Sequence, residues 1–185
     1  MHSNSVYVGI DVACALCKRL PLCVVSTGHP LLPHAMPAPL NAVIPRGPGN
    51  KEILAAEPFR ILARAVADGL AQACKELGWV VKRIAIDAPA AAPESGCRSS
   101  EKQLAETGLS SFITPALSAW PQIHEICVNH LRASGKTASL PHANRIWMLY
   151  GFELFCALRA KFDCEVIEVY PFAIIRVKAG AIIPH

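Results

Sequence analysis

Three short apolar segments, each carrying an acid near its C-terminal end, constrain most strongly what this chain can fold into. They are Val6–Ala13 with Asp11, Val80–Ala88 with Asp87, and Cys164–Tyr170 with Glu168. The first alternates apolar and other residues, and the second is a nearly continuous β-branched run; both patterns are typical of β-strands. Because desolvating a carboxylate is costly, an acid that interrupts a buried strand needs a partner.

Signals between these segments predict an α/β fold. A further strand is expected at Leu20–Ser26, joined to the first by a turn, and the Pro- and Gly-rich stretch 27–50 leaves room for an edge strand near Leu31–Met36 followed by a loop. Helical spacing predicts these helices: Glu57–Leu77 ended by Gly78, Ser99–Thr107 capped by Ser99 or Ser100 and ended by Gly108, one around Ile123–Leu131, Asn144–Lys161, and a short one from Phe172. Hairpin strands come first and βαβ crossovers later, which predicts a mixed sheet, antiparallel then parallel, with helices on both faces.

Length and composition narrow the class of protein. The 185 residues suit a single domain over 1–185, and the net charge of +4 permits a polyanionic partner without a block of Lys or Arg that would demand one. No apolar run approaches the roughly 18 residues of a membrane span, and the N-terminus lacks a signal-peptide pattern. We therefore expect a cytoplasmic protein with no membrane partner. Among the eight cysteines only Cys14 and Cys17 are closely spaced, so free thiols are favoured over a zinc site.

The strand-end acids predict a metal site. If the Asp11 and Asp87 strands are parallel neighbours, their carboxylates lie a few Å apart, and the repulsion between them raises one pKa. A bound Mg²⁺ or Mn²⁺ removes that conflict, and two such ions can clamp a phosphodiester and activate water. The alternative is that each acid caps a helix or pairs with an Arg. Glu168 is either a third metal ligand or a residue at the border of the site.

Arg98 and Glu101 follow the Asp87 strand at a spacing of one helical turn, so both can face the same side. In a functional role, Arg98 binds a phosphate of the substrate and Glu101 adds a metal ligand or a catalytic base. The alternative is an ion pair on the protein surface.

These segments also carry a resemblance to a known family. GIDVA at Gly9–Ala13, AIDAPAAAP at Ala85–Pro93, the Arg98 and Glu101 pair, and IEVYP at Ile167–Pro171 together resemble domain of unknown function 429, a family described as predicted nucleases of RNase H-like fold. The resemblance implies that the Asp11 and Asp87 strands are parallel neighbours with the Glu168 strand beyond, and that these two aspartates match the core acids of RNase H-like enzymes.

One departure from the RNase H-like pattern concerns the end of the chain. Such enzymes draw a last acid from a C-terminal helix, whereas residues 172–185 contain no Asp or Glu. Either Glu168, Glu101 or Glu57 completes the site, or the site is incomplete because a C-terminal segment is lacking.

The leading hypothesis is therefore a metal-dependent nuclease or phosphodiesterase with catalytic residues Asp11, Asp87, Glu168 and Glu101. The alternatives are a non-catalytic nucleic-acid or ligand-binding module of the same fold, and a nucleotide-phosphate hydrolase, which lacks glycine-rich phosphate loops here. The SGKT sequence at Ser134–Thr137 lacks the preceding strand and glycine of a P-loop. We interpret Trp120, Trp147 and Phe152 as core or rim aromatics rather than a base-stacking platform.

Overall fold

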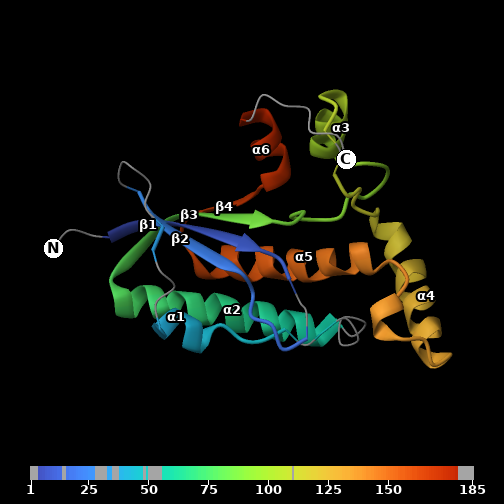
Figure 1. Cartoon of the computed structure of the whole chain (residues 1–185), viewed down its shortest axis with the longest axis horizontal. Helices are drawn as coiled ribbons and strands as arrows, with labels where there is room; N and C mark the ends of the chain where they lie inside the picture. The colour runs from blue at the N-terminus through green and yellow to red at the C-terminus, as the bar shows by residue number, and fades with distance from the viewer. Residues whose placement is uncertain are drawn as a thin grey trace.

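The computed structural model describes residues 4–13, 16–27, 33–34, 38–47, 49, 56–109 and 111–178, without the side chains of residues 39, 41, 56 and 176–178. Its centre is a four-stranded mixed sheet in the order β2-β1-β3-β4 (Figure 1). The strands are β1 (Asn4–Asp11), β2 (Leu22–Ser26), β3 (Trp79–Asp87) and β4 (Glu165–Glu168). β1 is antiparallel to β2 and parallel to β3, and β3 is parallel to β4, which confirms the predicted α/β class and mixed sheet.

Six α-helices are described around this sheet. They are α1 (Ala38–Val43), α2 (Ala56–Leu77), α3 (Ser99–Glu106), α4 (Trp120–Arg132), α5 (Ala143–Lys161) and α6 (Pro171–Lys178). Gly78 ends α2 with a φ of +65°, a left-handed conformation that glycine adopts without strain. The predicted serine cap of α3 is wrong: the capping position is Arg98, which makes no side-chain capping bond, and both serines lie inside the first turn.

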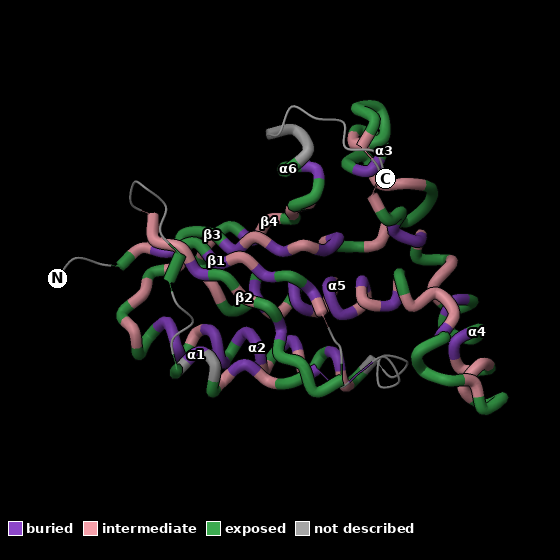
Figure 2. Tube along the Cα trace, in the orientation of Figure 1, coloured by how far each residue is buried: buried purple, intermediate pink, exposed green. Residues whose placement is uncertain are grey.

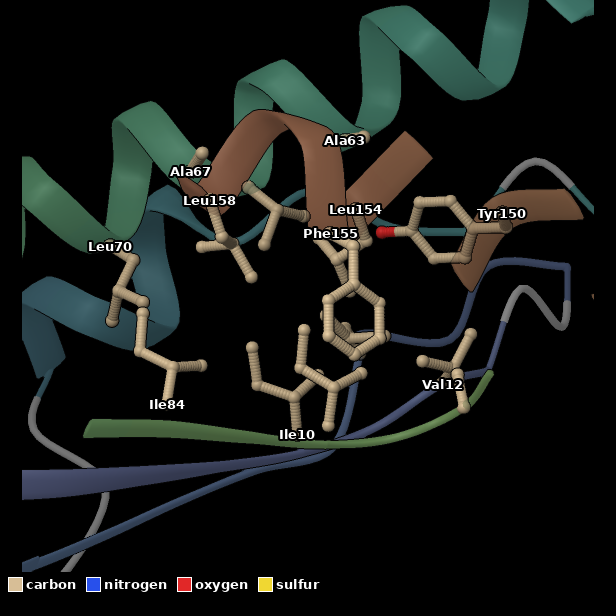
Figure 3. Packing of buried hydrophobic residues seen from close by; sticks show 14 of the residues in the cluster. Ile10, Val12, Ala63, Ala67, Leu70, Ile84, Tyr150, Leu154, Phe155 and Leu158 are labelled. Atoms are coloured by element: carbon tan, nitrogen blue, oxygen red, sulfur yellow. The ribbon is translucent and has the colours of Figure 1, made fainter. Parts of the chain in front are cut away.

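The core lies between the sheet and the pair α2 and α5. Alternate residues of the parallel strands are buried on this face, and Figure 3 shows Ile10 and Ile84 pointing from the sheet toward Leu154 and Leu158 of α5. Figure 2 shows buried residues along the inner sides of α2 and α5, with exposed residues on the outer side of α2 and mostly intermediate ones along the rest of α5. Removing this apolar surface from water is the main stabilising contribution, at about 25 cal/mol per Å².

The opposite face of the sheet is more open than predicted. Tyr7 of β1 is 38% exposed, and the side chain of Arg83 in β3 is 53% exposed. The described helices therefore bury the sheet fully on one face, and for this face the prediction of helices on both faces is confirmed. The physical reason is that the residues alternating with the buried ones include Gly9, Arg83 and Ala85, which offer little apolar surface for a helix to cover.

The stretch predicted as a loop contains the helix α1. Leu40 and Ile44 are buried against the core, and Gly69 of α2 lets the α1 backbone approach so closely that an added Cβ would lie 2.8 Å from the Val43 carbonyl oxygen. Tertiary packing therefore forms a helix where the local Pro and Gly content favoured a loop. Pro33 makes an isolated antiparallel bridge to Val25 of β2, at the expected edge, and the His34 backbone N–H donates to the Val24 carbonyl oxygen at 2.8 Å. The other residues of the predicted edge strand, 31–32 and 35–36, lie outside the described residues.

Helix α5 approaches the end of β3 very closely. Gly151 lies against Ala88, and a Cβ built at Gly151 would be 2.8 Å from the Ala88 Cβ. This contact brings the N-terminal half of α5 next to the strand end that carries Asp87.

Within the described part of the chain, no helix combines the length and hydropathy needed to span a bilayer. The described cysteines are free thiols, as predicted, and Cys14 lies outside the described residues.

Candidate functional site

Asp11 and Asp87 occupy neighbouring strand ends. They are direct Cα partners in the parallel pairing of β1 with β3, and adjacent strands lie about 4.8 Å apart. Paired residues in a sheet project from the same face, so the two carboxylates share one side of the sheet edge. The predicted convergence of these two acids is therefore present.

Both acids line a cleft of about 250 Å³ at the C-terminal ends of the parallel strands. Its walls come from α3, from the segment 111–114, from the N-terminal half of α5, and from the residues that follow β4. Its polar lining comprises Asp11, Asp87, Arg98, Ser100, Glu101, Ser111, Thr114 and Glu168, and its apolar lining includes Leu104, Phe112, Trp147, Met148, Val169 and Tyr170. Ligands of open α/β sheets bind beyond these strand ends, so the position agrees with a ligand site.

The electrostatics of the cleft act on Asp87. Burial raises the pKa of its carboxyl above the ordinary value, and the negative charges of Asp11 and then Glu168 raise it further. The charges of Asp11 and Glu168 thus disfavour the charged form of Asp87 at this edge. A positive charge placed among them would relieve that repulsion.

Glu168 is held by two donors rather than left open. Its Oε2 accepts a hydrogen bond from the Ala90 backbone N–H at 3.1 Å and forms an ion pair with the Arg98 guanidinium. The backbone bond comes from the loop directly after β3, so it fixes the end of β4 against that loop. Glu168 lines the cleft as expected, and Arg98 partly neutralises it.

Glu101 is buried, with only 6% of its surface exposed. Its Oε1 accepts hydrogen bonds from the Thr114 backbone N–H and hydroxyl and lies 3.6 Å from Arg98, while its Oε2 accepts from the Cys97 thiol at 3.2 Å. The predicted surface ion pair with Arg98 is therefore a buried one. These contacts give Glu101 a structural role in holding α3 to the segment 111–114, and a role as metal ligand or base stays a prediction.

Arg98 connects the two glutamates. Its guanidinium reaches Glu168 and Glu101 and lies 3.5 Å from the Thr114 hydroxyl, and its side chain is 16% exposed. In this arrangement the Arg98 guanidinium neutralises two carboxylates of the protein itself. Phosphate binding by Arg98, which also stays a prediction, would have to compete with them.

The structure brings Asp11, Asp87, Arg98, Glu101 and Glu168 to one cleft but does not add the remaining candidate acid. Glu57 lies in the first turn of α2, exposed and 3.7 Å from Arg60, and does not line the cleft. Among the described residues, no three His, Cys, Asp or Glu side chains are grouped to hold a metal ion together. Of the four described acids that line the cleft, Asp11 and Asp87 are the two outside the Arg98 network.

Several cleft residues fall outside the predicted site, Thr114, Phe112 and Trp147 among them. Thr114 is buried and its backbone N–H donates to Glu101, while Phe112 and Trp147 add aromatic side chains to the lining. The interpretation of Trp120 and Trp147 as core or rim aromatics is confirmed, because both are partly buried and pack against the core. Trp120 also packs edge to face on Phe152 with ring centroids 5.9 Å apart, and Trp147 in addition lines the cleft that contains the acids. The only sequence signal for the position of Trp147 is that it precedes Gly151 by four residues, so that both lie on the same face of α5.

Comparison with protein-family models, with curated proteins and with solved structures gave no significant match to any of them. The resemblance to domain of unknown function 429 therefore stays a prediction based on its motifs.

Proposed function

We propose that this chain is a divalent-metal-dependent nuclease or phosphodiesterase of RNase H-like fold that acts on nucleic acid through Asp11 and Asp87. One observation carries the proposal: the two aspartates are direct partners at the ends of the parallel strands β1 and β3. The strand order also supports it, because the Glu168 strand lies beyond the Asp87 strand, as the sequence resemblance implies.

The chemistry of the strand-end pair suits a hard cation such as Mg²⁺ or Mn²⁺. Mg²⁺ is commonly held by one or two carboxylates together with water and substrate phosphate. The pKa of Asp87, raised by burial and by Asp11, means that the uncompensated pair is strained electrostatically. A cation bound there would stabilise the charge that develops on a phosphodiester and activate water for its hydrolysis.

The other residues of the cleft position this pair. Glu168 adds negative charge from the neighbouring strand while it is paired with Arg98. The ion pair of Arg98 with Glu168 holds the start of α3 beside the end of β4, and the Glu101 bonds to Thr114 tie α3 to the segment 111–114. The proposal thus assigns cation binding to the two aspartates and support of the cleft to the buried network.

A non-catalytic binding module of the same fold is the second candidate. The observation that favours it is the engagement of Glu168 and Glu101 by Arg98, which leaves two carboxylates rather than three or four for a cation. Calorimetry separates the candidates: saturable Mn²⁺ binding that Asp11→Asn removes supports the enzyme, and its absence with nucleic acid still bound supports the module.

The direct test is cleavage of labelled DNA and RNA by the purified chain with Mn²⁺. We expect cleavage that EDTA stops and that Asp11→Asn and Asp87→Asn each abolish without loss of helical circular dichroism. The matched control is Asp68→Asn, which removes an exposed aspartate of α2 paired with Lys161; a surface pair of this kind contributes about 0–1 kcal/mol, so activity should be unchanged. Cleavage that persists at the wild-type rate in Asp11→Asn would overturn the proposal.

A further inference from the structure

We infer that the cleft beside Asp11 and Asp87 receives one unpaired nucleotide, with its base stacked between aromatic side chains, so that the substrate is single-stranded nucleic acid. The inference rests on the proposed function for the chemical class of the ligand. It adds the strandedness and the residues that recognise the base.

Three aromatic side chains from separate elements line the cleft together with the acids. Phe112 comes from the segment 111–114, Trp147 from α5, and Tyr170 from the residues after β4. The Trp147 indole is oriented by a hydrogen bond from its Nε1 to the Asn144 carbonyl oxygen at 2.9 Å. Aromatic faces held in this way stack on bases of any sequence, which is how proteins bind single strands without sequence preference.

The size of the cleft favours one strand. Its volume of about 250 Å³ lies below the range of roughly 300–1,000 Å³ typical of drug-sized ligands, so it suits a small group such as a single base rather than a length of duplex. A duplex keeps its bases stacked and paired inside the helix. A base can meet Trp147 while its phosphate lies at Asp11 and Asp87 only after it has left its partner, and this costs least in a single strand.

The charge of the cleft also favours a single strand over a duplex. Arg98 is the only Lys or Arg among the described cleft-lining residues, and it is already paired with Glu168 and Glu101. Contacts to many backbone phosphates, on which sequence-independent duplex binding depends, are therefore poorly provided for at this site. Base stacking therefore contributes more to binding in this cleft than contacts to backbone phosphates do.

The test measures binding separately from cleavage. Fluorescence anisotropy with Ca²⁺ in place of Mn²⁺ keeps a hard cation for the carboxylates and the phosphate. It compares single strands of about 12 nucleotides, as DNA and as RNA, with duplexes of the same sequence; nucleoside monophosphates serve as competitors. We expect single strands to bind at least about ten-fold more tightly than duplexes, since each stacked base contributes about 1–3 kcal/mol. Duplex binding of equal strength, or competition by a monophosphate as strong as by the oligonucleotide, would overturn the inference.

Two neighbouring residues provide a matched pair of variants. Phe112 and Ile113 are each 59% exposed, but only Phe112 lines the cleft. We expect Phe112→Ala to weaken single-strand binding by about ten-fold and Ile113→Ala to leave it unchanged, with Trp147→Ala weakening it and Trp147→Phe restoring most of it. Equal effects of Phe112→Ala and Ile113→Ala would contradict the assignment.

The outcomes separate this inference from the proposed function. Binding of single strands that depends on Phe112, without Mn²⁺-dependent cleavage, would reject the nuclease and keep the inference. Cleavage that requires Asp11 but is unaffected by Phe112→Ala and prefers duplex would reject the inference and keep the nuclease.

Discussion

Gly151 of α5 packs against Ala88, the residue that follows Asp87, so closely that the helix position leaves no room for a side chain at 151. The same helix supplies Trp147 and Met148 to the cleft. The distance between α5 and the end of β3 therefore depends on a glycine in the interior of a helix.

We expect Gly151→Ala to destabilise the protein by about 1–3 kcal/mol, because the added methyl overpacks against Ala88. At an unconstrained helix position the same change stabilises by up to about 1 kcal/mol. The sign of the change in the free energy of unfolding therefore shows whether the close contact with Ala88 is present. Urea denaturation measures it. The double variant Gly151→Ala with Ala88→Gly should recover part of the loss, and a stabilising effect of Gly151→Ala alone would show that the close contact is absent.

The electrostatic conflict at Asp87 gives a pH dependence of stability. Its pKa is raised in the folded chain, first by burial and then by Asp11 and Glu168, so the folded state binds this proton more tightly than the unfolded state does. The free energy of unfolding therefore falls as pH rises from the ordinary carboxyl pKa through the raised one, and stays lower above it.

Asp87→Asn removes that penalty. Without divalent cations, we expect the melting temperature of the variant to exceed that of the wild type by roughly 1–3 °C at pH 7. At acidic pH, where Asp87 of the wild type is protonated in the folded and in the unfolded chain, the two melting temperatures should match. Added Mn²⁺ should raise the melting temperature of the wild type only. Scanning calorimetry at several pH values checks this, and a variant less stable than the wild type at neutral pH would contradict it.

Two Arg–Glu pairs reach β4, and they should differ in energetic weight. Arg98 pairs with Glu168 and Glu101 with its side chain 16% exposed, whereas the side chains of Arg83 and Glu165 are both more than half exposed, with 2.6 Å between them. Removing one partner of a buried pair leaves an uncompensated charge at a cost of about 3 kcal/mol or more, while an exposed pair contributes less than about 1 kcal/mol.

We accordingly expect Arg98→Ala to lower the free energy of unfolding strongly and to speed amide hydrogen exchange in α3, which Arg98 and Glu101 hold in place. Arg83→Ala is the control and should change both measurements little. Similar losses in the two variants would mean that the buried network carries no special weight.

The thiol of Cys97 should react slowly for its position near the cleft. Its hydrogen bond to Glu101, together with burial, raises its pKa, so less of it is the reactive thiolate at a given pH. We expect iodoacetamide at pH 8 to label Cys97 more slowly than the exposed Cys156, as followed by mass spectrometry. Glu101→Gln should speed the labelling of Cys97 and leave that of Cys156 unchanged; an unchanged rate at Cys97 would argue against the bond.

Local sequence patterns were sufficient for the elements whose signals are strong and consistent. The apolar runs that end at Asp11 and Asp87 are strands, and the periodic segments that form α2 and α5 are helices within a few residues of their expected ends. α1 was missed because its Pro- and Gly-rich surroundings indicate a loop, and only packing of Leu40 and Ile44 on the core stabilises a helix there.

The order of residues is enough to show which side chains can carry charge into the sheet edge, because an acid in an apolar strand is visible from composition and alternation alone. How those charges are shared depends on the folded arrangement. Strand register brings Asp11 and Asp87 together, while the placement of α3 turns Arg98 toward Glu168 and buries Glu101 with Thr114. Pairing across the sheet and contact between distant segments depend on three-dimensional packing, which residue spacing along a chain does not specify.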